Sequence, residues 1–61
     1  MKDRLLKLRE VQDATSVKKS TIYHLMSLGE FPKNIKVGSR SVAWRESEIQ
    51  QWIADRPTNQ I

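Results

Sequence analysis

The 61-residue sequence has no cysteine and only one histidine, His24. Without cysteine the chain forms no disulfides, no thiolate zinc site and no cysteine nucleophile. A single histidine excludes a histidine-rich metal site, so we expect no metal and no cofactor. The two glycines lie far apart, which excludes a glycine-rich phosphate-binding loop.

Long apolar stretches are also missing. No run approaches the roughly 20 residues of a membrane span. The charged start of the chain, MKDRLLKLREV, is not followed by the apolar segment of a signal peptide. We therefore expect a cytoplasmic protein with no membrane partner. Candidate nucleophiles lie on short segments with no room for a cleft, which predicts no catalytic residues, no small-molecule substrate and no enzyme activity.

Positive charge is concentrated in the middle of the chain. Residues 18–40 carry five lysines and arginines against one glutamate, so this segment has a net charge of +4, equal to that of the whole chain. A polyanionic partner would bind there. A solvated basic surface is the alternative interpretation.

The apolar pattern first predicts two short helices joined by a tight turn. Residues 9–15 form the first helix, and Leu8, Val11 and Ala14 fall on one face of it. Thr15 and Ser16 make the turn, and Val17 points inward.

The second helix covers residues 19–28. Its buried stripe consists of Ile22, Leu25, Met26 and Leu28. Gly29 follows at once and suits the left-handed residue that ends a helix.

The rest of the chain predicts a hairpin and a third helix. Two short strands within 34–44 flank a turn at 38–40, with Arg40 at the tip and Lys36 nearby. The last helix, 46–55, aligns Ile49, Trp52 and Ile53, and Pro57 stops it. A short extended segment precedes the first helix, around Leu5 and Leu6.

This order of elements predicts a mostly α fold with a small β-hairpin, a winged helix-turn-helix. We expect one domain over residues 1–61, with the helix-turn-helix at 9–28, the wing at 34–44 and the C-terminal helix at 46–55. A domain of this size buries roughly 60 % of its unfolded surface, so its core is thin. Phe31, Trp44 and Trp52 are expected to complete that core.

Helical geometry then selects a candidate DNA-binding face. If Ile22 faces inward, the turn of about 100° per residue directs Lys19, Ser20, Tyr23 and, less directly, His24 outward. Lysines and hydroxyls suit phosphates and base edges, and an arginine on the wing suits the minor groove. The predicted DNA-binding residues are Lys18, Lys19, Ser20, Thr21, Tyr23, His24, Lys36 and Arg40.

Each of these residues also has a plainer interpretation. Tyr23 can simply cover the edge of the core, and His24 can be a bystander on the helix surface. Lys18 and Lys19 can be solvated, and Arg40 can belong to an ordinary polar turn.

The chain resembles the AlpA family of small prophage regulators from about Leu5 to Arg56. The resemblance rests on an ordered set of pieces: Thr15, STIY at 20–23, GEFP at 29–32, VG at 37–38, Arg40, VAWRESEI at 42–49, and Trp52-Ile53. It implies a MerR-like winged helix-turn-helix that binds DNA and controls prophage or genomic-island genes. The family usually has glycine in the turn and serine as the cap of the second helix, where this chain has Ser16 and Lys18.

The leading functional hypothesis is a sequence-specific transcriptional regulator of a prophage or integrated element, with double-stranded DNA as its partner. One alternative is an excisionase-type factor that bends DNA at attachment sites, as related proteins of this fold do. Another is a protein-only adaptor that binds integrase or RNA polymerase. Further copies of the chain on adjacent sites are also expected, because one small module buries only about 600–1,000 Å² on DNA.

Overall fold

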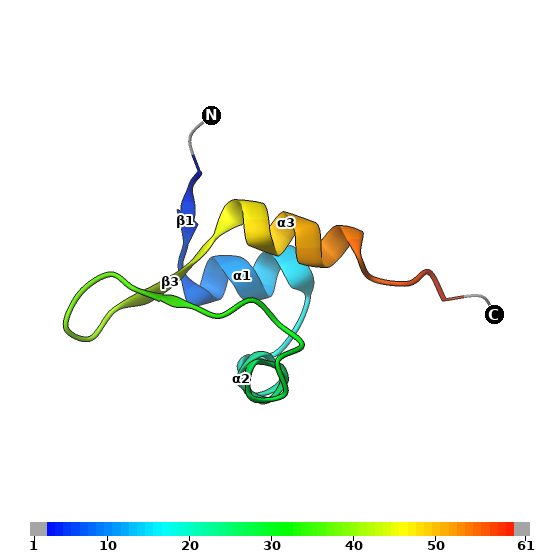
Figure 1. The fold of residues 1–61 in the computed structure, drawn as a ribbon, viewed down its shortest axis with the longest axis horizontal. Helices are drawn as coiled ribbons and strands as arrows, with labels where there is room; N and C mark the ends of the chain where they lie inside the picture. Colours follow the sequence, from blue (N-terminus) through cyan, green and yellow to red (C-terminus); the bar gives the residue numbers. More distant parts are fainter. Residues whose placement is uncertain (1–2, 60–61) are drawn as a thin grey trace.

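The computed structural model describes residues 3–59. Its elements are, in chain order, β1 (Leu5–Leu6), α1 (Leu8–Thr15), α2 (Lys19–Ser27), β2 (Ile35–Lys36), β3 (Val42–Arg45) and α3 (Glu46–Ala54). Figure 1 shows α1 and α3 together, α2 below them, and the hairpin projecting to one side. Three helices with a small antiparallel sheet confirm the predicted fold class. None of the helices in this part of the chain has the length and apolar character needed to cross a membrane.

The sheet has the strand order β1-β3-β2. In the hairpin, Ile35 lies opposite Ala43 and Lys36 opposite Val42. On the other side of β3, Leu5 lies opposite Arg45 and Leu6 opposite Trp44. The sequence predicts the hairpin and an extended segment near Leu5, but not the pairing of that segment with β3.

One small core holds the elements together. Its buried residues are Leu6, Val11, Ile22, Phe31, Trp44 and Ile49. The predicted burial of Ile22, Phe31 and Trp44 is confirmed. Val17, Trp52 and Ile53 are partly buried and pack against this core at its edge.

Two predicted core positions are wrong. Ala14 is exposed, because the packed face of α1 continues from Val11 to the half-buried Thr15, whose hydroxyl donates to the Val11 carbonyl at 2.7 Å. Leu28 is 55 % exposed, because α2 ends at Ser27 and Leu28 is already its C-cap. In β3 the neighbouring residues Ala43 and Trp44 are both buried, whereas Val42 is exposed, so this strand does not simply alternate between buried and exposed residues.

The turn between α1 and α2 depends on an unusual backbone. Ser16 has φ +61° and donates its backbone N–H to the Gln12 carbonyl at 2.8 Å. A left-handed conformation costs a residue with a side chain roughly 1–2 kcal/mol. Ser16 therefore occupies a position that glycine suits better.

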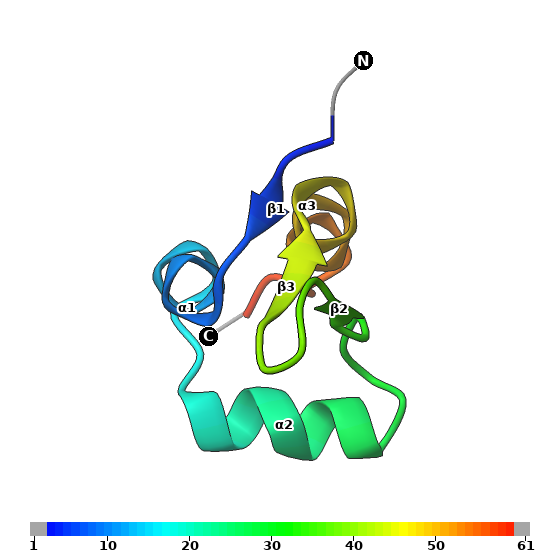
Figure 2. The same ribbon diagram turned by 90° about the vertical axis from the view of Figure 1, so that its left-hand side faces the viewer.

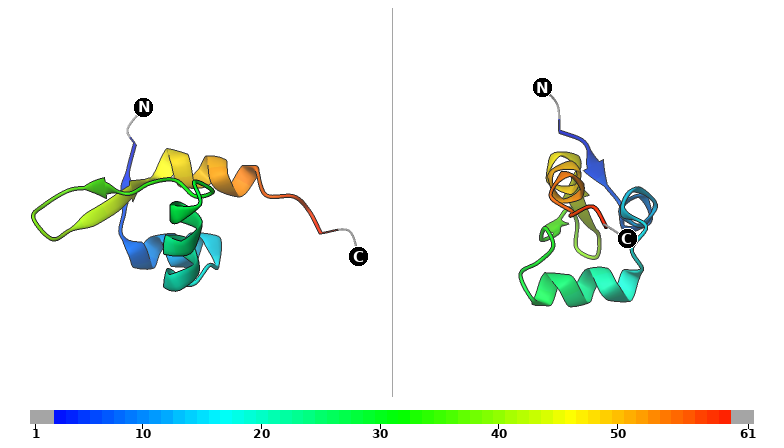
Figure 3. Two further views of the ribbon diagram at one scale, coloured as in Figure 1. Left: turned by 60° about the horizontal axis from the view of Figure 1, so that its bottom comes forward. Right: turned by 90° about the vertical axis from the view of Figure 1, so that its right-hand side faces the viewer.

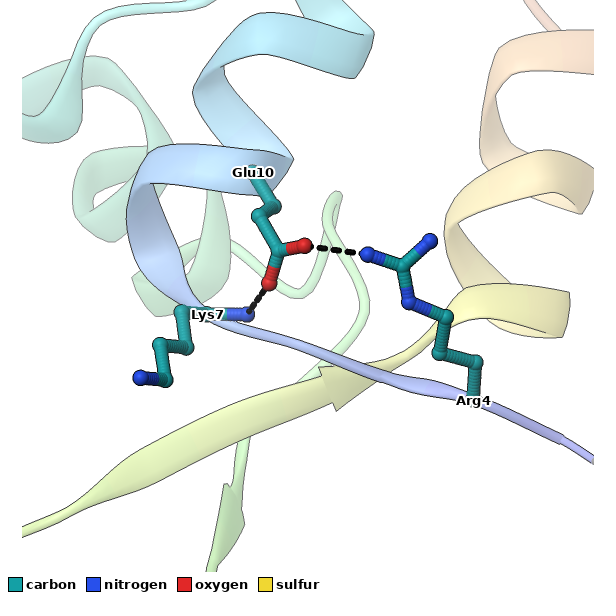
Figure 4. Close-up of polar contacts among 3 residues, drawn as sticks. All are labelled: Arg4, Lys7 and Glu10. Carbon is teal, nitrogen blue, oxygen red and sulfur yellow. Dashed lines mark hydrogen bonds and ion pairs between the residues drawn. The ribbon is translucent and has the colours of Figure 1, made fainter.

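The N-terminal segment ties α1 to α3. Asp3 accepts hydrogen bonds from the Ser47 backbone N–H (3.0 Å) and hydroxyl (2.7 Å), which lower the pKa of Asp3 below its ordinary value. Glu10 accepts the Lys7 backbone N–H at 3.0 Å and forms an ion pair with Arg4 (Figure 4). The hydrogen bond from Lys7 is the main cause that lowers the pKa of Glu10, and the positive charge of Arg4 adds to it.

Candidate nucleic-acid interface

The helix α2 forms a layer of its own at one side of the molecule. Figure 2 shows it running across the bottom, below α1 and the sheet. The fully buried Ile22 anchors it, and the half-buried Leu25 and Met26 add to this contact. The rest of its surface faces outward along its whole length.

The structure places the predicted α2 residues on this outward surface. Lys19, Ser20, Thr21 and His24 are exposed. Lys18 is also exposed and precedes the helix as its N-cap, with extended backbone. These residues form a continuous polar and basic strip beginning at the N-terminus of α2.

The Tyr23 side chain is partly exposed and partly packed against the core. Its side chain is 39 % exposed, yet its ring meets the fully buried Trp44 edge to face, with centroids 6.3 Å apart. The plainer interpretation of Tyr23 as a cover for the core edge therefore holds for part of the ring. The remaining exposed part is compatible with the predicted contact.

The N-terminus of α2 is positive and its amides are left open. A lysine side chain accepts no hydrogen bond, and no side chain within residues 3–59 caps this helix. The first turn contains no acidic residue and begins with Lys19. Open amides, the helix dipole and two lysines together favour a negatively charged group at this end.

The wing carries the other two predicted residues. Lys36 in β2 and Arg40 at the tip are both exposed, and Val37 donates its N–H to the Ser41 carbonyl at 2.9 Å to close the loop. The hairpin projects away from the body on the side that faces the viewer in Figure 2. Within the described residues, neither Lys36 nor Arg40 forms an ion pair, so both charges are available to a partner.

The chain matches the family model described as prophage CP4-57 regulatory protein (AlpA) over residues 4–57. It belongs to the AlpA family. The uncharacterized protein ORF88 of Enterobacteria phage P4 is 41 % identical over 54 residues, covering 88 % of this chain. The DNA-binding transcriptional activator AlpA of Escherichia coli (strain K12) is 34 % identical over 59 residues, covering 87 % of this chain and 84 % of that protein. The chain spans 61 % of the length of the phage P4 relative.

The AlpA-family match confirms the predicted resemblance. At two positions before α2 this chain departs from the residues usual in the family. Ser16 adopts the left-handed turn conformation, and Lys18 stands at the N-cap position without a capping bond. Loss of a side-chain cap costs about 0.5–2 kcal/mol. In this AlpA-family protein, the entry of α2 is therefore less stabilised by its own chain than a serine-capped helix would be.

The sequence prediction missed polar features around the segment that follows α2. Lys33 is exposed there and adds a further charge, and its place in the basic stretch 18–40 was the available signal. Trp44 and Trp52 were predicted only as core. Their indole N–H groups donate to the Pro32 carbonyl (3.0 Å) and the Glu30 carbonyl (2.9 Å). A partly buried indole N–H generally has an acceptor, but its identity depends on long-range packing.

Proposed function

We propose that this protein is a sequence-specific DNA-binding regulator of transcription in a prophage or integrated element. The observation that carries the proposal is the exposed, uncapped and basic N-terminal half of α2, which presents Lys18, Lys19 and Ser20. Family membership supports it, since the related AlpA of Escherichia coli is named a DNA-binding transcriptional activator.

In the proposed complex, α2 enters the major groove. The groove is about 12 Å wide, and an α-helix with its side chains is about 10–12 Å across. Lys18 and the open amides meet backbone phosphate, while Lys19, Ser20 and Thr21 reach phosphates or base edges. Tyr23 and His24 lie one turn further along and extend the same face.

The hairpin provides the second contact. Arg40 reaches the neighbouring minor groove or its phosphates, and Lys36 contacts the backbone. This assigns the helix-turn-helix to residues 9–28 and the wing to 34–44 of a single domain, with the 46–55 helix bracing the core. A second copy on an adjacent site would supply the contact area that one small module lacks.

The test is DNase footprinting on the DNA that flanks the gene, followed by binding titrations on the protected site. Lys19→Ala should weaken binding several-fold and reduce the slope of log affinity against log salt by about one. Tyr23→Phe removes the hydroxyl but keeps the ring that packs on Trp44, so it separates contact from stability.

The matched control is Gln50→Ala, at an exposed position of α3. It should bind DNA like the unsubstituted protein. All three variants should have the melting temperature of the unsubstituted protein. Unchanged binding by both Lys19→Ala and Tyr23→Phe would show that α2 is not the recognition helix.

A further inference from the structure

The segment 28–34, here called the connector, joins α2 to the hairpin. Its first residues are locked to the end of the helix. Gly29 has φ +72° and donates its N–H to the Met26 carbonyl at 3.1 Å, and Glu30 donates to the Leu25 carbonyl at 2.8 Å. This pair of bonds is a Schellman motif, which fixes the direction in which the chain leaves α2.

Two indole groups then hold the middle of the connector. Trp52 of α3 donates its Nε1–H to the Glu30 carbonyl at 2.9 Å, and Trp44 of β3 donates its Nε1–H to the Pro32 carbonyl at 3.0 Å. The two carbonyls flank Phe31, whose side chain is buried and whose ring centroid lies 4.8 Å from that of Trp52. Three consecutive connector residues are thus fixed from two different elements, and Figure 3 shows the connector passing close to α3.

Trp44 links three parts of the molecule. It lies in β3, the second strand of the hairpin, and its N–H holds the connector. Its ring also meets Tyr23 of α2 edge to face. The strand that bears the wing, the connector and α2 therefore share one fully buried side chain.

These bonds are more than core packing. Trp52 is only partly buried, so water could accept its N–H, yet that N–H donates to a connector carbonyl. A phenylalanine would fill much of the same space without constraining Glu30. Fixing two binding elements relative to each other removes the entropic cost of ordering the second contact when the first has formed.

We infer that Trp44 and Trp52 are positioning residues, whose indole N–H groups fix the connector and thereby the distance between α2 and the hairpin tip. The consequence for DNA rests on the proposed function: α2 and the wing engage one duplex as a preset pair rather than independently.

The first experiment measures this distance in the free protein. Because the chain has no cysteine, Ser20→Cys and Ser39→Cys provide two unique sites for nitroxide labels. Double electron–electron resonance spectroscopy then gives the distribution of distances between the label on α2 and the label at the hairpin tip. We expect Trp52→Phe to broaden or shift it. Ser47→Ala, which removes a hydrogen bond to Asp3 at the other end of α3, should leave it unchanged.

The second experiment measures DNA affinity in a double-mutant cycle. Arg40→Ala should weaken binding and lower the salt slope by about one in the unsubstituted and Ser47→Ala backgrounds. In the Trp52→Phe background, the fold-change caused by Arg40→Ala should fall to less than half, because the wing no longer sits at its preset position. All titrations are made at a temperature where circular dichroism shows each variant fully folded.

An unchanged distance distribution in Trp52→Phe overturns the inference, and so does a full Arg40→Ala effect in that background. If Arg40→Ala binds DNA like the unsubstituted protein, the proposed wing contact is wrong, and the distance distribution alone decides the inference. If Trp52→Phe does not fold, chemical synthesis of the chain with benzothienylalanine at position 52 replaces the N–H by sulfur at nearly constant shape.

Discussion

The helices α2 and α3 are built to the same plan. Each has nine residues, follows a basic N-cap residue with extended backbone, and buries one isoleucine completely: Ile22 in α2 and Ile49 in α3. Their contributions to the core are therefore closely similar. The two helices differ in how far the chain itself provides partners for the polar groups at their ends.

In α3 the chain itself provides partners at both ends of the helix. Glu46 and Glu48 lie in its first turn, and Asp3 accepts the Ser47 N–H there. At the other end, Arg56 stacks on Trp52 with its guanidinium carbon 4.2 Å from the ring centroid. In α2 the first turn has no acid and, among residues 3–59, no capping side chain. The contrast supports the proposal that α2, rather than α3, is the helix that binds DNA.

The largest predicted effect tests whether Ile22 and Ile49 anchor their helices to a similar extent. Ile22→Ala and Ile49→Ala should each cost about 2–5 kcal/mol, because each removes a fully buried side chain. Losses of this size approach the whole stability of so small a domain. Denaturant titrations followed by circular dichroism should show both variants largely unfolded. A native-like transition for either one would mean that its helix is not anchored through that isoleucine.

Charge reversal tests the difference. Lys19→Glu in α2 should weaken DNA binding by roughly tenfold or more, since a charged contact is worth about 1.5–3 kcal/mol. It should also raise stability by about 0.3–1 kcal/mol, because an acid joins the first turn. Glu48→Lys in α3 should lower stability by a similar amount and leave DNA binding at least as strong. Anisotropy titrations measure the DNA binding, and thermal melts measure the stability. If both variants changed DNA binding and stability in the same direction, the proposed difference between α2 and α3 would be wrong.

Acid should weaken the hydrogen bonds and the ion pair that link the N-terminal segment to α1 and α3. Hydrogen bonds from Ser47 depress the pKa of Asp3, and the Lys7 N–H together with Arg4 depresses that of Glu10. A depressed folded-state pKa contributes stability above the unfolded value, and this contribution is lost as the pH falls through the folded value. Melting temperature should therefore fall as the pH drops below about 4, the unfolded range of these carboxyls. Asp3→Asn should flatten that fall, and an equally steep fall in Asp3→Asn would show that its bonds to Ser47 do not matter.

The smallest predicted effect concerns the entry to α2. Ser16→Gly removes a left-handed strain of about 1–2 kcal/mol and adds an entropic cost of about 0.5–1 kcal/mol, a net gain of roughly 0.5–1 kcal/mol. The melting temperature should rise slightly, while Ser16→Ala should give no such gain. A lower melting temperature for Ser16→Gly would contradict the strain.

Local patterns predicted the elements well. The apolar spacing around Val11, Ile22 and Ile49 indicated three helices, and Gly29 marked the end of α2 with the left-handed backbone that the structure shows. The exposed strip from Lys18 to His24 followed from the inward direction of Ile22 alone. These features depend on residues within a few positions of each other.

The features that the sequence did not predict join residues that are distant in sequence. The pairing of Leu5 and Leu6 with β3, the capping of α3 by Asp3 and the indole bonds to the connector all join separate parts of the chain. Periodicity carries no information about such partners. The errors at Ala14 and Leu28 have local causes. Leu28 is exposed because α2 ends at Ser27, before its apolar stripe does, and Ala14 is exposed because the packed face of α1 continues from Val11 to Thr15.

The most direct test of the central claim is an NMR titration of the ¹⁵N-labelled protein with its footprinted duplex. We predict that the resonances of the amides in residues 18–24 and in the wing around Lys36 and Arg40 shift, while those of α3 from Ser47 to Ala54 do not. Shifts centred on α3, or binding that leaves the amides of α2 unperturbed, would contradict it.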